Sequence, residues 1–94
     1  ADYGLVRLGA KRVYYAYGED DSLLSATNER LLNGYQLKGD KDKNRIDAIA
    51  WLCKALANSG NSSYRSTLDK VADTADNRKI AKYAKSSSKQ GLKG

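Results

Sequence analysis

The stretch between Arg45 and Ala57 carries apolar side chains around most of the circumference of a helix. Many of them recur at the i, i+3, i+4, i+7 spacing of one helical face, and the others widen that stripe beyond the roughly 100° of an ordinary surface helix. Lys54 is the only charged residue between Ala48 and Ala57. A helix this apolar needs neighbours on two sides, so we expect it to be the central helix of an all-α domain. Its apolar residues are Ile46, Ala48, Ile49, Ala50, Trp51, Leu52, Cys53, Ala55, Leu56 and Ala57.

Both ends of this helix are marked by residues that favour helix termini. Asn44 is a good N-cap, and Asp47 places negative charge in the first turn, where the helix dipole favours it. Asn58 and Ser59 lead to Gly60, which suits the left-handed position after a helix. The predicted helix therefore lies within Asn44–Gly60, with its apolar stripe over 45–57.

Residues 3–17 fit a helix with one apolar face, which Gly18 would end. Val13, Tyr15 and Tyr17 also fit the alternation of a strand, which β-branched and aromatic residues favour. No nearby segment offers a partner strand, so we prefer the helix. The members of the helical face are Val6, Ala10, Val13, Tyr14 and Tyr17.

Three more helices are expected around the central one. The first is capped by Asp21 or Ser22, with Leu24, Thr27, Leu31 and Tyr35 on one face. The second is capped by Asn61, with Tyr64, Leu68, Val71, Ala72 and Ala75 on one face. The third is capped by Asp76, with Ile80, Tyr83, Ala84 and Ser87 inward.

The end of the chain is expected to lose helical order. Ser86–Ser88 have poor helix propensity, so we expect fraying there and disorder through the last residues. The sequence thus predicts one helical domain over 1–90 and a disordered basic tail over 91–94. Its architecture would be about five helices in an α-α superhelix-like (HEAT/ARM-like) arrangement or in an orthogonal bundle.

The residues that usually perform catalysis or bind metals are scarce. The chain has no His, and its one Cys, Cys53, lies on the apolar stripe, where a buried small hydrophobe is expected. Asp40, Asp42 and Asn44 match the start of a calcium loop, but Arg45 stands where that loop needs Gly. We therefore expect no enzyme activity and no cofactor. No apolar run approaches the roughly 20 residues that span a bilayer.

Positive charge is concentrated at the C-terminal end. Residues 1–76 are neutral, and residues 77–94 supply the whole net charge of +6. A basic stripe at helical spacing is either a solvated outer face or a contact for an anionic partner such as a nucleic acid. The stripe consists of Arg78, Lys82, Lys85 and Lys89, and Lys79 beside it is the fifth candidate for contact with an anionic partner.

The second half of the chain resembles the repeats of HEAT and armadillo-like superhelices. Residues 47–61 form an alanine- and leucine-rich helix that ends in a Ser-Gly-Asn turn, Tyr64, Leu68 and Val71 follow, and residues 76–84 open a capped basic helix. The resemblance covers 45–90. The sequence lacks the proline that the family has in its helix A, and it is too short for the family's usual number of repeats. It implies a scaffold that binds proteins, with no catalytic residue to transfer.

The favoured function is therefore a non-enzymatic helical scaffold for protein–protein interaction or self-association. The alternative is nonspecific nucleic-acid binding through 78–93. A start at Ala1 without Met suggests export after removal of a signal peptide, with a cytoplasmic location as the other possibility. Candidate binding residues for the scaffold are Tyr14, Tyr15, Tyr17 and Tyr35.

Overall fold

The computed structural model describes residues 3–16, 18–36, 43–60 and 62–91, and this part of the chain contains helices and no strand. The all-α prediction is confirmed, and the segment that also fitted a strand is helical. A short 3-10 turn, η1 (Ser62–Tyr64), precedes the fourth helix. The helices are α1 (Tyr3–Ala16), α2 (Asp21–Gly34), α3 (Lys43–Asn58), α4 (Arg65–Thr74) and α5 (Arg78–Gly91).

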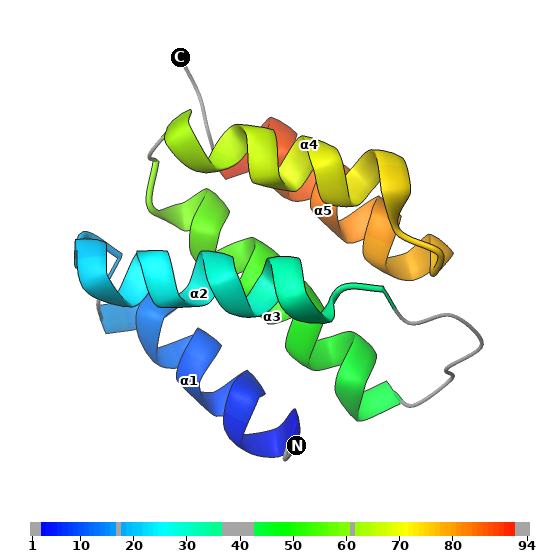
Figure 1. Cartoon of the computed structure of the whole chain (residues 1–94). Helices are drawn as coiled ribbons and strands as arrows, with labels where there is room; N and C mark the ends of the chain where they lie inside the picture. Colours follow the sequence, from blue (N-terminus) through cyan, green and yellow to red (C-terminus); the bar gives the residue numbers. More distant parts are fainter. Residues whose placement is uncertain (1–2, 17, 37–42, 61, 92–94) are drawn as a thin grey trace.

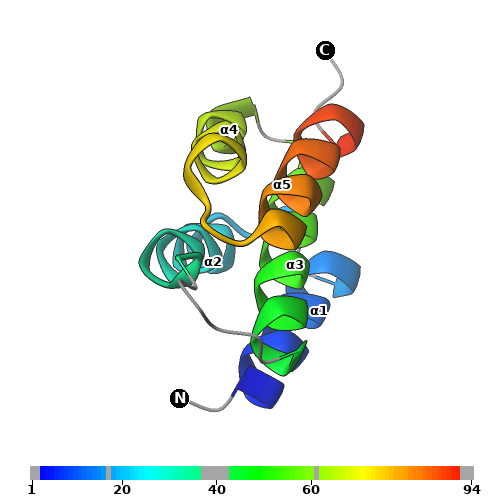
Figure 2. The ribbon, with the colours of Figure 1, turned by 90° about the vertical axis from the view of Figure 1, so that its right-hand side faces the viewer.

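The five helices lie in two layers, which Figure 2 shows side by side. One layer contains α1, α3 and α5, and the other contains α2 and α4. Successive helices therefore alternate between the layers. In Figure 1, α1 and α2 diverge from their shared end, and α3 crosses behind α2. Leu5 of α1 and Leu23 of α2 are both exposed in this region.

The α3 helix is the centre of the molecule, as its apolar stripe predicts. It packs against α1, α2 and α5, and Cys53, Ala55 and Leu56 have no exposed surface. Trp51 is the exception, because its indole is only half-buried, although it packs against the core. One hydrophobic cluster joins α3 to residues from all four other helices.

The N-cap of α2 lies one residue earlier than predicted. Asp20 Oδ1 accepts a hydrogen bond of 3.0 Å from the Leu23 N–H, so Asp20 is the cap and Asp21 is the first helical residue. Three similar residues, Asp20, Asp21 and Ser22, compete for this position. The extended backbone of Asp20 decides between them, because a cap residue has non-helical dihedral angles.

The N-cap of α5 also differs from the prediction. Asn77 Oδ1 accepts hydrogen bonds from the Lys79 and Ile80 N–H groups at 2.9 and 3.2 Å, so Asn77 replaces Asp76 as the cap. The Asp76 N–H instead donates to Gln36 Oε1 at 3.0 Å. This contact ties the α4–α5 connection to the residues that follow α2.

The predicted caps of α3 and α4 have different outcomes. The α3 helix already begins at Lys43, so Asn44 lies in its first turn and is not its cap. The residue before Lys43 and the predicted cap Asn61 lie outside the described residues. Gly60 has a φ of +69°, and its N–H donates to the Ala57 carbonyl at 3.2 Å, so its predicted left-handed conformation after α3 is confirmed.

The predicted fraying at Ser86–Ser88 is wrong, because α5 continues to Gly91. Ser87 and Ser88 are buried, and Ser88 Oγ donates a hydrogen bond of 2.8 Å to Asp69 Oδ1 on α4. Packing against α4 thus overrides the weak helix propensity of serine. Of the predicted disordered tail 91–94, Gly91 belongs to α5, and 92–94 lie outside the described residues.

Tyr35 is buried and cannot be the surface binding residue that the sequence suggests. Its position on the apolar face of the preceding helix determines this outcome. Its hydroxyl lies 2.7 Å from Thr74 Oγ1, which itself donates to the Lys70 carbonyl, so Tyr35 is the donor. This hydrogen bond connects the end of α2 to the end of α4.

Substitution of Tyr35 by Phe is expected to lower the free energy of unfolding by about 1 kcal/mol, the usual net value of one hydrogen bond. Urea denaturation followed by far-UV circular dichroism measures this difference. Tyr15→Phe is the matched control, because that side chain is 74% exposed and should leave stability unchanged. Equal effects of the two substitutions would show that the contact with Thr74 contributes nothing.

Candidate functional site

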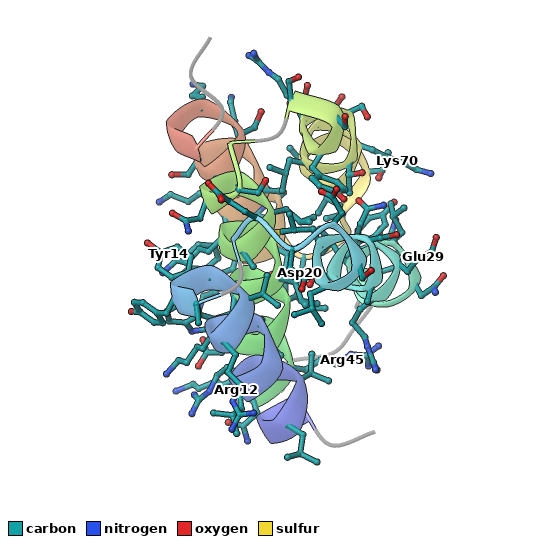
Figure 3. The ribbon with its side chains drawn as sticks, turned by 90° about the vertical axis from the view of Figure 1, so that its left-hand side faces the viewer. Arg12, Tyr14, Asp20, Glu29, Arg45 and Lys70 are labelled. Atoms are coloured by element: carbon teal, nitrogen blue, oxygen red, sulfur yellow. The ribbon has the colours of Figure 1, made fainter. Side chains whose placement is uncertain are left out.

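Two surfaces with distinct chemistry flank α1. The first lies on the outer side of the layer formed by α1, α3 and α5, and the second lies between α1 and α2. Figure 3 shows Arg12 and Tyr14 of α1 projecting to one side of the molecule, opposite Glu29 of α2 and Lys70 of α4. Side chains on α1 therefore reach a surface from which the α2–α4 layer is absent.

Three aromatic rings form the centre of the first surface. The Tyr14 ring meets Trp51 edge-on at a centroid distance of 5.6 Å, and it meets Tyr15 edge-on at 4.8 Å. The Tyr15 and Trp51 centroids lie 6.1 Å apart with tilted planes. Edge-to-face pairs at these distances are favourable aromatic contacts. The cluster keeps one highly exposed ring, that of Tyr15, at the surface.

Two lysine side chains lie against the Trp51 indole. Lys11 Nζ is 5.0 Å from the ring centroid, and Lys54 Nζ is 4.7 Å from it. Both distances are within the range of a cation–π interaction. Lys54 is exposed and Lys11 is half-buried, so both ammonium groups can also reach solvent or an anion.

The aromatic cluster borders one of two hollows on the outer side of α3. The first hollow, of about 450 Å³, is lined by the three rings and by Lys54, Ala57, Asn58 and Ser87. The second, of about 590 Å³, is lined by Lys43, Ile46, Asp47, Lys79, Lys82, Tyr83 and Ser86. Because α3 contributes to both, the hollows follow one another along this helix.

We call this surface the basic–aromatic face, and its charge is almost entirely positive. Asp47 is the one acid among the described residues that line the two hollows. An ion pair of 3.9 Å to Arg7 Nη1 partly neutralises that acid. The members of the face are Lys11, Tyr14, Tyr15, Lys43, Trp51, Lys54, Lys79, Lys82 and Tyr83.

The second surface, which we call the apolar groove, lies where α1 and α2 diverge. Its volume is about 440 Å³, and Leu52 of α3 contributes to its lining. Leu5 is 66% exposed at the groove, and Leu8 is 50% exposed one turn further along α1. Its other lining residues are Val6, Gly9, Ala10, Val13, Leu23, Ala26, Thr27 and Arg30.

The structure divides both predicted sets of site residues. Tyr14 and Tyr15 lie together on the basic–aromatic face, Tyr35 is buried elsewhere, and Tyr17 lies outside the described residues. The basic candidates on α5 are exposed as expected, but only two of them line a hollow. These are Lys79 and Lys82, whereas Arg78, Lys85 and Lys89 are exposed on other parts of α5.

One aromatic residue of α5 was assigned to the wrong environment. Tyr83 was expected to point inward, but it is 40% exposed and lines the second hollow. Ile80 and Ala84, on the same predicted face, are buried as expected. Tyr83 thus lies at the edge of the buried stripe, where a tyrosine can keep its ring against the protein and its hydroxyl in water.

Several residues of these surfaces were missed by the sequence prediction, although a signal existed. Leu5 and Leu8 fall outside the predicted helical face of α1, so the helical phase already implied their exposure. Trp51 and Lys54 are three residues apart, so a helix places them on one side. Lys11 could be assigned to Trp51 only once the packing of α1 on α3 was known.

The Cys53 thiol is buried in the core and belongs to neither surface. Burial raises the pKa of the Cys53 thiol from 9.0 to about 12, so this side chain is protonated at neutral pH and is a poor nucleophile. Within the described ranges, no group of three Cys, Asp or Glu side chains is placed to hold a metal ion. No described helix is long and apolar enough to cross a membrane.

Comparison of the chain with family models, with characterised proteins and with solved structures finds no match.

Proposed function

We propose that this protein is a non-enzymatic helical scaffold that binds an acidic amphipathic helix of another protein in its apolar groove. The observation that carries the proposal is the exposure of Leu5, 66%, beside a hollow whose lining is mostly apolar. Complete burial of a leucine side chain contributes about 1.5–3 kcal/mol. A partner that covers the groove would gain a large part of this free energy at Leu5 and a smaller part at Leu23, which is 38% exposed.

A helix is the element that fits this groove best. The groove lies between two diverging helices, and the side chains of a third helix can pack into such a space. The space beside Gly9 is open, since a Cβ at this position would meet no atom within 4 Å. A partner strand would need a sheet edge, and the described residues contain no strand to supply one.

The charge around the groove favours an acidic partner over a second copy of the chain. Arg30 lines the groove, and no acid is among the described residues that line it. Two copies that met through this side would bring their Arg30 side chains together, and the whole chain already carries +6. Like charges at an interface disfavour association, whereas an acidic helix would complement them.

The alternation of helices between two layers supports a scaffold of the helical-repeat type. Stacked helix pairs with this alternation are what the resemblance of 45–90 to HEAT and armadillo-like repeats implies. We propose that this chain is related to such repeat proteins. Such proteins bind their partners on the extended surface that their stacked helices form.

Two synthetic amphipathic helices of about 18 residues, or five turns, test this proposal. Both carry the same leucine face, and one has glutamate and the other lysine on its polar face. We expect the acidic peptide to bind at least about tenfold more tightly, which corresponds to about 1.4 kcal/mol. Fluorescence anisotropy of the labelled peptides gives the affinities, and amide chemical shifts of Gly9 and Ala26 locate the bound peptide.

The double variant Leu5→Gln, Leu23→Gln removes apolar surface from the groove without changing the charge. Glutamine is a good helix former, so both helices should be retained. The matched control is Ser25→Gln, an exposed position on α2 that does not line the groove. The double variant should lose at least tenfold in affinity and the control none. Equal binding by all three proteins, or no binding of either peptide, would refute the proposal.

Sedimentation velocity at increasing protein concentration tests whether a second copy of the chain occupies the groove in place of a partner helix. We expect a monomer throughout. A dimer that the double variant abolishes would show that another copy of the chain fills the groove, and it would overturn the assignment of an acidic partner.

A further inference from the structure

The basic–aromatic face lies apart from the apolar groove and is not used by the proposed function. It combines exposed rings with ammonium groups along one helix, the outer side of α3. We propose that this face binds single-stranded nucleic acid, with bases stacked on its rings and phosphates bound by its lysines. This inference does not depend on the groove, and it stands or falls on its own experiment.

The rings on this face offer stacking surfaces. Tyr15 is 74% exposed although it lies 6.1 Å from the Trp51 centroid. Tyr83 is 40% exposed beside the second hollow. A role in the core explains the buried edge of Trp51, but it does not explain why two tyrosine rings remain at the surface of a hollow. Proteins that bind single strands present aromatic rings in this way, because every base has a face that can stack.

Five lysines lie among these rings. Lys11 and Lys54 flank Trp51, and the other three line the second hollow: Lys43, Lys79 and Lys82. The acid beside them, Asp47, is paired with Arg7. In proteins that bind single-stranded nucleic acid, a positively charged groove follows the phosphate backbone and the bases stack on aromatic rings within it.

The face is long enough to contact a short segment of single-stranded nucleic acid. Its α3 positions extend from Lys43 to Lys54, and eleven residues of helix rise by about 16 Å. The two hollows lie along this line, one beside α1 and the other beside α5. A single strand can therefore run along α3 and contact rings in the first hollow and lysines in the second.

The same observations disfavour a duplex. The bases of a duplex are already stacked and paired, so the rings of Tyr15 and Trp51 could not reach their faces. They also disfavour a membrane surface. A helix that lies in a bilayer interface buries an apolar face rich in Leu, Phe and Trp, whereas the exposed rings of the basic–aromatic face belong to Tyr15 and Tyr83. The most exposed aliphatic residue, Leu5, lines the apolar groove and is not part of the basic–aromatic face.

The single Trp of the chain makes the test specific to this site. Titration with oligothymidylate of about 16 nucleotides, the upper end of a typical site size, should quench the fluorescence of Trp51. The logarithm of the affinity should fall with the logarithm of the salt concentration, with a slope of up to about −3.5 if all five lysines contact phosphates. Anisotropy of the labelled oligonucleotide gives an independent affinity.

Variants separate this face from general positive charge. Lys11→Gln with Lys54→Gln should weaken binding at least about tenfold, and Tyr15→Ala should do so without a loss of charge. Arg65→Gln with Lys70→Gln removes the same charge from exposed positions of α4 and should have a smaller effect. Because Tyr15 is highly exposed, its variant should fold even if a lysine variant does not.

Several outcomes would overturn the proposal. These are the absence of Trp51 quenching, an equal loss in the α4 control, or equal affinity for the duplex of the same sequence. If Lys85→Gln with Lys89→Gln abolishes binding and the Lys11, Lys54 pair does not, the exposed stripe of α5 is the site instead. Binding of vesicles containing phosphatidylserine with no binding of the oligonucleotide would assign the face to a membrane surface.

Discussion

Replacement of Leu56 by alanine is expected to lower the free energy of unfolding by about 3–5 kcal/mol. Leu56 is completely buried in α3, the helix that packs against three others. The substitution removes apolar contacts and leaves a cavity that its neighbours cannot fill without moving. Because small domains are stable by only about 5–15 kcal/mol, the variant should unfold at a much lower urea concentration.

Trp51→Ala is the informative comparison, because Trp51 belongs to the same helix but is half-buried. We expect a loss of about 2 kcal/mol, below the value of about 3–5 kcal/mol typical of a fully buried Trp. Urea denaturation followed by far-UV circular dichroism gives both values. If Trp51→Ala is the more damaging substitution, the aromatic cluster and not the middle of α3 is the main source of stability.

The central position of α3 could be predicted because its cause is local. An apolar stripe that covers most of a helix requires neighbours, whatever their identity. The helix over 3–17 is preferred over a strand because no nearby segment offers a partner strand. Its predicted face through Val6, Ala10 and Val13 does pack in the core. The periodicity of apolar residues does not specify which helices are neighbours. The two layers could therefore not be predicted from it.

The end of α5 shows how tertiary contacts override local preference. Ser86–Ser88 are poor helix formers, and alone they would favour fraying. In the structure Ser88 is buried and donates to Asp69 of α4, a residue 19 positions earlier in the chain. A contact at that separation leaves no signal in the propensity of a local segment, so no pattern within 77–94 could reveal it.

The candidate surfaces were only partly predictable for a related reason. Helical phase separates Leu5 and Leu8 from the buried face of α1, so their exposure follows from the sequence. The meeting of Lys11 with Trp51 depends on how α1 packs on α3, which the phase of either helix alone does not give. The same holds for Lys79 and Lys82, which differ from the other basic residues of α5 only through the neighbouring α3.

The two proposed surfaces share α1 but use different sides of it. Leu5 and Gly9 line the apolar groove beside α2, whereas Lys11 and Tyr14 lie beside Trp51 of α3. A partner helix and a nucleic-acid strand could therefore occupy the domain together. If both proposals hold, the protein is an adaptor between a partner protein and a nucleic acid. Variants of one surface should then leave binding at the other surface unchanged.

Stability at high pH should depend on Cys53. Its pKa is about 12 in the folded protein, mainly because burial disfavours the thiolate, and 9.0 is its ordinary value. Below pH 9 both states keep the proton and the thiol has no effect. Between pH 9 and 12 the unfolded chain loses the proton first, so it binds fewer protons than the folded protein and the free energy of unfolding falls. The fall is about 1.36 kcal/mol per pH unit.

Comparison of the parent with Cys53→Ala isolates this contribution, because the two proteins share every other ionisable group. Urea denaturation under reducing conditions at pH 7 and pH 10.5 gives the four free energies of unfolding. We expect the parent to lose about 2 kcal/mol more than the variant between these pH values. Equal losses would require the thiolate to be as well solvated in the folded protein as in the unfolded chain. Such solvation conflicts with a side chain that has no exposed surface, and it would mean that α3 opens around Cys53 at high pH.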